Sequence, residues 1–287
     1  MGARRWSANG ALVAAGSLVL TIVGACTSIS SAAQRQVERA TLVTKPARAV
    51  TPADIGVPFT RIWIEHDGRR LEAWAVFGAD SVNANSAVFI CHGTGETLSD
   101  WVYVQRLLRE EGITSFVFDY TGFGNSTGTP TAQALEADAI AAYKSFNALL
   151  PTDMRRSALG FSLGSGVLLA AFPRMQPPLD GLIVASAFST ARRAALRRRF
   201  FPGILAYLAP DTVWNNVAAI RNVNAPLRIV HSDADRAFPL SMARELARAS
   251  RQPGSLIIQH GYAHNALYAK ATAAQWQPLV RFIVKGS

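Results

Sequence analysis

Ser162 stands at the centre of the run Gly160-Phe161-Ser162-Leu163-Gly164, where a short apolar segment gives way to a helical one. A serine hydroxyl attacks a carbonyl carbon only when it is exposed and has a base beside it. A sharp turn between a strand and a helix exposes such a side chain, and flanking glycines let the backbone approach itself closely. The run is therefore suited to a nucleophilic serine, whose chemistry would be acyl transfer.

The same pentapeptide resembles the G-x-S-x-G nucleophile elbow of the α/β-hydrolase superfamily, whose chain order is serine, acid, histidine. The histidines of this chain are His66, His92, His231, His260 and His264. The resemblance favours His264 as the base, because it follows the last apolar run and the first three histidines come too early or adjoin a turn. His260 lies four residues before it, but neither has a carboxylate or cysteine beside it to complete a metal site. We expect no metal and no cofactor.

The acid that would orient the histidine is expected in the run His231-Ser232-Asp233-Ala234-Asp235-Arg236-Ala237-Phe238-Pro239. This run resembles the H-G-x-x-D-x-x-V-P segment of many α/β-hydrolases, with Ser232 in place of glycine and Phe238 in place of valine. The resemblance places the acid of the triad at Asp235. Asp233 is the alternative, and its other interpretation is a loop residue that accepts backbone hydrogen bonds.

Acyl transfer also needs hydrogen-bond donors for the oxyanion that forms on the attacked carbonyl. The N–H of Leu163, directly after the nucleophile, is the first donor that the resemblance implies. His92-Gly93-Thr94-Gly95-Glu96 looks like an H-G-x-G oxyanion loop, which makes the Thr94 N–H the second donor. A plain glycine turn is the alternative for this run.

Short apolar runs that alternate with helical stretches must position these residues. An alternating segment over 59–66, the turn signal Asp67-Gly68 and a second segment over 71–77 predict a β-hairpin. The further strands are expected at 87–91, 114–119, 157–161, 182–187, 227–231 and 255–259. The helices are expected at 100–109, 130–150 (with Thr129 as N-cap and Pro130 in the first turn), 163–172, 240–250 and 266–284. Apolar strands separated by helices predict an α/β fold with a mostly parallel sheet and helices on both faces. With the antiparallel hairpin and a short helical cap, this is the α/β-hydrolase fold that the resemblance implies over 59–284.

The N-terminus is expected to lie outside this fold. A basic start, an uncharged stretch over 6–25 and small residues at its end describe an export signal. Its ending, Val23-Gly24-Ala25-Cys26, resembles the lipobox of bacterial lipoproteins, in which the cysteine is acylated and becomes the N-terminus. The resemblance implies a signal peptide over 1–25 and a membrane anchor on Cys26. Because Thr27 rather than Asp follows, it also implies the periplasmic face of the outer membrane. An uncleaved single span is the alternative, since about 20 uncharged residues just cross a bilayer.

Composition and charge bound the remaining possibilities. The 287 residues are 49% hydrophobic and 17% charged, which excludes a disordered chain and a polytopic membrane protein. We expect a tether and edge segment over 26–58 and a hydrolase domain over 59–287, with a cap at about 188–225. The cap carries Arg192, Arg193, Arg197, Arg198 and Arg199. These arginines fit a solvated basic helix or a lid that meets anionic headgroups. Nucleic acid is not expected as a partner, because the net charge of +10 is the only feature that would favour it.

The sequence thus predicts a serine hydrolase that cleaves a carboxylic ester, with an acyl or lipid-like substrate, through an acyl-enzyme. Its triad would be Ser162, Asp235 and His264. An S33-type peptidase or amidase is one alternative, and a non-catalytic binding protein that retains the fold is the other. The substrate's identity and the oligomeric state stay open at this point.

Overall fold

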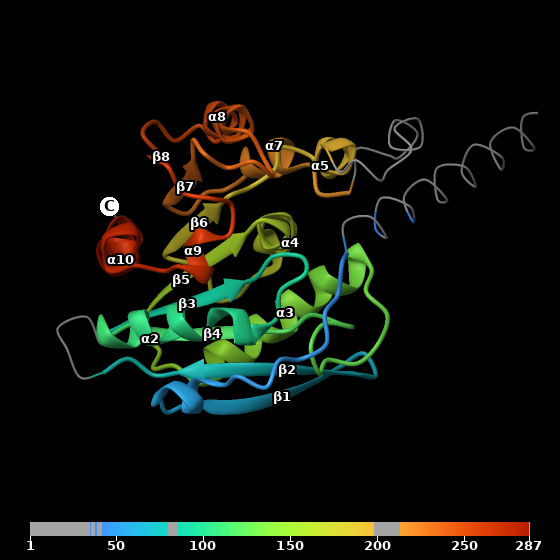
Figure 1. Cartoon of the computed structure of the whole chain (residues 1–287), viewed down its shortest axis with the longest axis vertical. Coiled ribbons are helices and arrows are strands. Elements are labelled where there is room, and N and C mark those ends of the chain that lie inside the picture. The colour runs from blue at the N-terminus through green and yellow to red at the C-terminus, as the bar shows by residue number, and fades with distance from the viewer. Residues whose placement is uncertain (1–34, 36–37, 39–41, 80–84, 198–212, 287) are drawn as a thin grey trace, which may run out of the picture.

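One sheet runs through the part of the chain that the computed structural model describes, namely Arg35, Glu38 and residues 42–79, 85–197 and 213–286 (Figure 1). Within those residues the sheet has eight strands, in the order β1-β2-β4-β3-β5-β6-β7-β8. The strands are β1 (Thr60–His66), β2 (Arg69–Val76), β3 (Ser86–Cys91), β4 (Thr114–Phe118), β5 (Arg155–Phe161), β6 (Gly181–Ala185), β7 (Leu227–Ser232) and β8 (Leu256–Gln259).

The predicted hairpin opens the sheet. β1 pairs with β2 in antiparallel fashion across Asp67 and Gly68, whose φ angles of 47° and 69° are those of a type I′ turn. β2 is antiparallel to β4, and all the pairings from β4 to β8 are parallel. The predicted fold class is therefore confirmed: the sheet is mostly parallel and an antiparallel hairpin leads into it.

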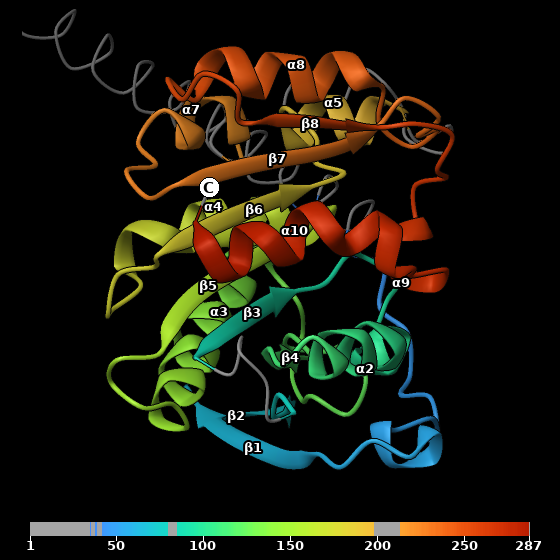
Figure 2. The same ribbon diagram turned by 90° about the vertical axis from the view of Figure 1, so that its left-hand side faces the viewer.

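Helices cover both faces of this sheet, as the fully buried central strands require. Val88 and Ile90 of β3 pack under α2, α9 and α10, which lie in front of the strands in Figure 2. Ala87 and Phe89 point to the other face, under α3, α4, α7 and α8, because successive side chains of a strand alternate between faces. The helices are η1 (Pro52–Ile55), η2 (Leu98–Trp101), α2 (Val102–Glu110), α3 (Ala132–Ala148), α4 (Leu163–Ala171), η3 (Phe172–Arg174), α5 (Ala191–Arg197), α7 (Asn216–Ile220), α8 (Leu240–Ala249), α9 (Ala266–Ala269) and α10 (Ala273–Lys285).

The start of α3 differs from the prediction. The helix begins at Ala132, and its N-cap is Thr131, whose hydroxyl accepts a hydrogen bond from the N–H of Ala134 at 3.1 Å. Thr129 was expected as the cap, with Pro130 in the first turn. Two threonines stand two residues apart here, and the one nearer the helix satisfies a first-turn N–H.

The C-terminal helix also differs, because the stretch predicted as one helix over 266–284 is divided into α9 and α10. Thr272 starts α10 as its N-cap by accepting a hydrogen bond from the N–H of Gln275 at 3.3 Å. The indole N–H of Trp276 then donates to the carbonyl of Leu267 at 2.8 Å, which ties the two helices together.

The segment 42–58 lies along the surface of the domain. Leu42 and Val57 are buried, and the N–H of Val43 donates to the hydroxyl of Thr94 at 2.9 Å. The predicted signal peptide and Cys26 lie outside the described residues, and so does the middle of the predicted cap, residues 198–212. Among the helices that are described, none is long and apolar enough to span a bilayer.

Candidate active site

Ser162 lies on the tight turn between β5 and α4 that the sequence predicts. Its φ of 52° and ψ of −114° put it in a backbone region that L-residues avoid, and the surrounding structure holds that strain. A Cβ on Gly164 would lie 2.0 Å from the carbonyl oxygen of Cys91, and a Cβ on Gly160 2.6 Å from that of Gly164. Both flanking residues must therefore be glycine for β3, β5 and α4 to meet here.

His264 and Asp235 complete a continuous hydrogen-bonded chain with this serine. The Nε2 atom of His264 lies 3.1 Å from the Oγ of Ser162, and its Nδ1 atom lies 2.7 Å from the Oδ2 of Asp235. An ionised carboxylate can only accept, so Nδ1–H donates to Asp235 and Nε2 is left to accept the serine proton. The backbone N–H groups of Ala237 and Phe238 donate to Oδ1 of Asp235 at 2.8 and 2.9 Å, which fixes the carboxylate.

The electrostatics of the site keep Asp235 ionised. Burial acts to raise the pKa of this carboxyl, but the hydrogen bond and charge of His264 and the N–H of Phe238 outweigh it. The pKa of Asp235 is therefore lowered below its ordinary value. A carboxylate that stays charged can hold the imidazole and stabilise its protonated form.

Asp233 forms a second aspartate–histidine pair on the same loop. Its Oδ2 lies 2.7 Å from the Nδ1 of His260, and its Oδ1 accepts the N–H of Gly261 at 2.9 Å. This backbone bond, followed by the bond to His260, lowers the pKa of Asp233. The side chain of His260 is 80% exposed, whereas that of His264 is 18% exposed. Of the two histidines, His264 is the one whose ring reaches Ser162.

Two of the other histidines are buried supports, a role that the sequence reasoning did not assign. The Nε2–H of His231 donates to the carbonyl of Phe238 at 2.9 Å, and burial lowers its pKa, so a neutral ring braces the loop of Asp235. The Nε2 atom of His92 lies 3.2 Å from the Oδ1 of Asp119. Burial acts to lower the pKa of His92, but the hydrogen bond and charge of Asp119 outweigh it and raise the pKa.

The two predicted oxyanion donors lie beside the nucleophile. Leu163 is the first residue of α4, and the N–H groups of a helix's first turn have no partner within the helix. Thr94 is in the loop after β3, and both residues line a hollow with Ser162. The structure thus brings Leu163, Thr94 and Ser162 together.

Glu96 holds the loop that contains Thr94 in place. The sequence reasoning assigned this residue no role, although it is a single acid in an otherwise uncharged run. Its Oε2 accepts the N–H of Gly93 at 2.8 Å and the indole N–H of Trp101 at 3.1 Å. A Cβ on Gly93 would lie 2.3 Å from the Oε1 of Glu96, so the contact requires glycine there. Burial raises the pKa of Glu96 to about 7.

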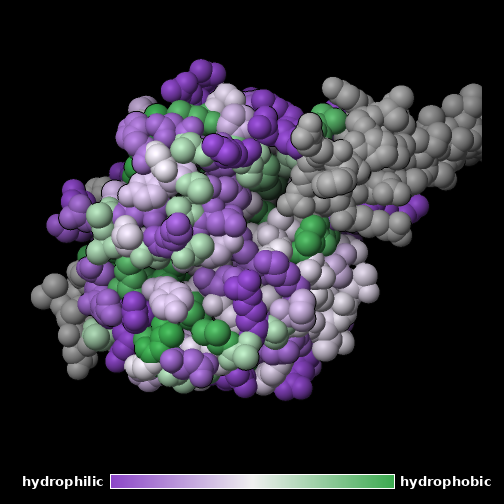
Figure 3. Space-filling model, in the orientation of Figure 1, coloured by the Kyte–Doolittle hydropathy of each residue, from purple (hydrophilic) through white to green (hydrophobic). Residues whose placement is uncertain are grey.

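Two hollows meet at Ser162. The first is narrow and apolar, and the residues lining it are Thr94, Ser162, Leu163, Phe188, Ala191, Ala194, Trp214 and Phe238. The second has a volume of about 310 Å³ and is lined by Thr94, Glu96, Ser162, Ala194, Arg197, Arg236, Ala237, Phe238, His264 and Asn265. Figure 3 shows an apolar recess between the region of α5 and α7 and that of α4.

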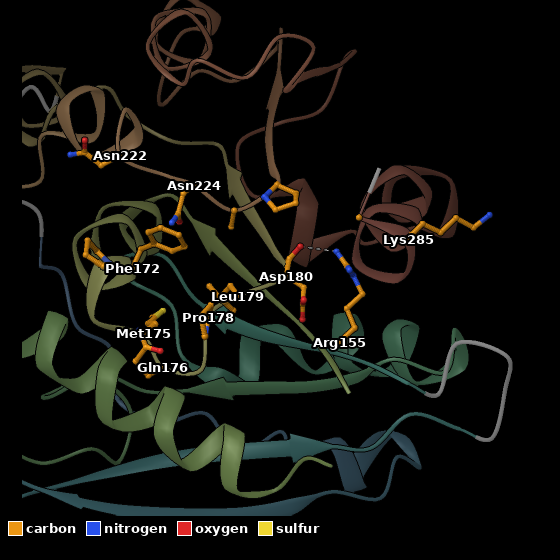
Figure 4. Close-up of a pocket in the computed structure, with 14 residues that line it drawn as sticks. Arg155, Phe172, Met175, Gln176, Pro178, Leu179, Asp180, Asn222, Asn224 and Lys285 are labelled. Carbon is orange, nitrogen blue, oxygen red and sulfur yellow. Dashed lines mark hydrogen bonds between the residues drawn. The ribbon is translucent and has the colours of Figure 1, made fainter. Parts of the chain in front are cut away.

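A larger hollow of about 700 Å³ lies at the other edge of the sheet, where β5, β6 and β7 begin (Figure 4). Its Arg155 is engaged in the fold, because Nε donates to the carbonyl of Ile283 at 2.9 Å and Nη2 to that of Asp180 at 2.7 Å. None of the predicted site residues lines this hollow. The predicted site residues therefore lie at the carboxyl ends of the strands and not in this larger hollow.

Known proteins resemble the chain in sequence and in fold. Residues 82–216 match the family described as serine aminopeptidase, S33. An uncharacterized protein of Mycobacterium tuberculosis (strain H37Rv) is 30% identical over 201 residues, which are 69% of this chain and 69% of that protein. The lysophosphatidylserine lipase ABHD12 of Mus musculus is 28% identical over 216 residues, 66% of this chain and 54% of the lipase.

Two solved structures share the fold at low sequence identity. The esterase Pf2001 of Pyrococcus furiosus has a TM-score of 0.63 at 17% identity, covering 85% of this chain and 97% of its own. A serine hydrolase without lid from Xanthomonas campestris has a TM-score of 0.59 at 18% identity, covering 83% and 97%. The sheet order, the elbow at Ser162, the family match and these relatives agree, and the chain belongs to the α/β-hydrolase superfamily.

Proposed function

We propose that this protein is a serine hydrolase that cleaves carboxylic esters of acyl or lipid-like substrates through an acyl-enzyme. The observation that carries the proposal is the chain of hydrogen bonds from Ser162 through His264 to Asp235, at 3.1 and 2.7 Å. Nucleophile, base and orienting acid stand in the order and at the distances that nucleophilic catalysis needs.

The first half of the reaction follows from this geometry. His264 Nε2 takes the proton from the Ser162 hydroxyl as Oγ attacks the carbonyl carbon, and the carbonyl oxygen becomes an oxyanion. The N–H groups of Leu163 and Thr94 are the donors proposed to stabilise that oxyanion. His264 then gives its proton to the departing alcohol oxygen, and the acyl group stays on Oγ.

The second half repeats the same steps with water. His264 takes a proton from a water molecule, whose oxygen attacks the acyl carbon of the Ser162 ester. When the tetrahedral intermediate collapses, Oγ leaves and recovers the proton from His264, and the carboxylic acid is released. Asp235 keeps its charge throughout and offsets the charge of the imidazolium.

The surroundings of Ser162 favour an ester with an apolar acyl group over a peptide. Phe188, Trp214 and Phe238 give the narrow hollow beside Ser162 an apolar lining, which favours contact with an acyl group. An aminopeptidase needs a carboxylate to bind the substrate's amino terminus, and the only acid lining the wider hollow, within the part of the chain described, is Glu96. Its Oε2 is already engaged by two donors. The relatives with esterase or lipase in their names support the same choice.

A fluorophosphonate probe on the full chain tests the proposed nucleophile. The wild type should be labelled, and Ser162→Ala should not. Ser241→Ala, which alters an exposed serine of α8, is the matched control and should be labelled like the wild type. Equal labelling of Ser162→Ala and wild type would contradict the assignment, and absence of labelling in all three would favour a binding protein.

A substrate series then tests ester against amide. We expect p-nitrophenyl esters of increasing acyl length to be hydrolysed with a larger kcat/KM than aminoacyl p-nitroanilides. The reverse order would favour the S33-type peptidase instead.

We also propose that the protein is exported and lipid-anchored through Cys26 to the bacterial cell envelope, in the outer membrane and facing the periplasm. The proposal is supported by the uncharged run that ends at Val23-Gly24-Ala25-Cys26. The intact mass of the native protein should show an acylated Cys26 at its N-terminus, and Cys26→Ser should lose the lipid or keep the signal. A native protein that begins at Met1, or that carries no lipid, would contradict this proposal.

A further inference from the structure

The two hollows at Ser162 differ in chemical character. The narrow hollow is lined mainly by apolar side chains, among them Phe188 and Trp214. The wider hollow shares part of this lining and adds His264, Asn265 and two arginines, Arg197 and Arg236. A substrate whose carbonyl lies at Ser162 therefore has an apolar wall and a polar, positively charged wall within reach.

The position of His264 indicates where the alcohol part of the ester lies. The proposed reaction requires His264 to hand its proton to the oxygen of the departing alcohol, so that oxygen must lie on the histidine's side of Ser162. His264 lines the wider hollow and not the narrow one. The alcohol part of the ester therefore lies in the wider hollow.

The wider hollow carries two positive charges that no acidic side chain among the described residues pairs with. Arg197 is the last described residue of α5, and its Nε donates to the carbonyl of Ala237 at 3.1 Å, which turns the side chain toward the loop after β7. Arg236 belongs to that loop and is exposed. Within residues 42–79, 85–197 and 213–286, neither arginine forms an ion pair with an acidic side chain.

Two acids close to these arginines, one in the lining of the hollow and one in sequence, are already engaged. Glu96, which lines the same hollow, is buried and accepts the N–H of Gly93 and the indole of Trp101. Asp235 is adjacent to Arg236 in sequence, but both of its oxygens are used by His264 and by the loop backbone. Two guanidinium groups thus line the place where the alcohol part of the substrate would bind.

We propose that Arg197 and Arg236 bind an anionic group on the alcohol part of the substrate, so that the preferred substrates are acyl esters of phosphate-bearing or carboxylate-bearing alcohols. Guanidinium groups are well suited to either anion because their N–H groups match two oxygens at once. The inference rests on the proposed function and specifies its substrate class.

The test compares three short esters on the full chain: 1-hexanoylglycerol, its 3-phosphate, and the hexanoyl ester of glyceric acid. The quantity measured is the ratio of kcat/KM for each anionic ester to kcat/KM for the neutral one. We expect a ratio of about ten in the wild type at low salt, since hydrogen bonds to charged groups are the stronger ones. The larger of the two ratios identifies phosphate or carboxylate, and about 0.5 M NaCl should lower it.

Variants of the two arginines test whether these residues cause the preference for anionic esters. Arg197→Gln and Arg236→Gln should each lower the ratio about threefold, and the double variant should bring it close to one. Arg281→Gln, which removes the same charge from an exposed position on α10 outside both hollows, is the control and should leave the ratio as in the wild type.

The outcomes separate this inference from the function on which it rests. A wild-type ratio near one, with Ser162-dependent hydrolysis of the neutral ester, would overturn the anion site and leave the esterase standing. A high ratio that persists in the double variant would overturn the role of these two arginines. Failure to hydrolyse any of the three esters would overturn the proposed function and this inference with it.

Discussion

The two aspartates of the loop after β7 provide an internally controlled test of the site. The Oδ2 atoms of Asp235 and Asp233 each lie 2.7 Å from a histidine Nδ1. Oδ1 of Asp235 accepts two backbone N–H groups, and Oδ1 of Asp233 accepts one. The pairs differ in burial, because the side chain of Asp235 is fully buried and that of Asp233 is 41% exposed. The same change, Asp to Asn, can therefore be made in both pairs.

Asp235→Asn should disable the base. The asparagine oxygen can still accept the N–H groups of Ala237 and Phe238, which turns the NH₂ group toward Nδ1 of His264. Two donors then face each other, and His264 is driven to carry its proton on Nε2, where it cannot accept from Ser162. The wrong tautomer removes general-base catalysis, which contributes about 10²–10⁴-fold to the rate, or about 3–5 kcal/mol of the barrier. At 1.36 kcal/mol for each factor of ten, kcat should fall by about two to four orders of magnitude.

Asp233→Asn should change kcat at most about fivefold, since an exposed pair is worth about 1 kcal/mol or less. The assay is steady-state hydrolysis of a p-nitrophenyl ester, with circular dichroism of each variant to establish that it is folded. Equal losses in the two variants, or a larger loss for Asp233→Asn, would refute the assignment of Asp235. A folded Asp235→Asn variant within about tenfold of the wild type would refute the reasoning about the tautomer.

Three further predictions concern the nucleophile, the elbow and the oxyanion loop. Ser162→Ala and His264→Ala should each remove most of the ester hydrolysis, and the double variant should lose little more because the groups act as a unit; losses that multiply would contradict this. Gly164→Ala should lower the midpoint of thermal unfolding, because its Cβ would lie 2.0 Å from a backbone oxygen and overpacking of this kind costs about 1–3 kcal/mol or more; an unchanged midpoint would show that β3 and α4 can move apart. Glu96 binds a proton more tightly in the folded state, with a pKa of about 7 against 4.5, so it makes the free energy of unfolding fall as pH rises between about 4.5 and 7. The free energy of unfolding of Glu96→Gln, measured by urea titration, should therefore rise relative to that of the wild type by about 3 kcal/mol between pH 4.5 and pH 7. A difference between the two proteins that stays constant with pH would refute the raised pKa of Glu96.

Sequence alone was sufficient for features that depend on neighbouring residues. The hairpin turn at Asp67 and Gly68 follows from two residues that accept positive φ, and both adopt it. The elbow at Ser162 follows from glycines at the points where a Cβ would strike backbone. The alternation of apolar strands with helices likewise predicted the parallel sheet, because strands buried on both faces must be apolar throughout.

Only the tertiary structure distinguished residues of the same type. Asp233 and Asp235 both pair with histidines. They differ because the ring centroids of Phe161 and Phe238 lie 5.2 and 5.3 Å from that of His264, the partner of Asp235. That packing comes from β5 and from the loop after β7, and it buries one pair beside Ser162. The same holds for Arg197 and Arg236, which come from separate elements and meet in one hollow. Spacing along the chain encodes local geometry, whereas burial and convergence depend on segments that only the folded chain brings together.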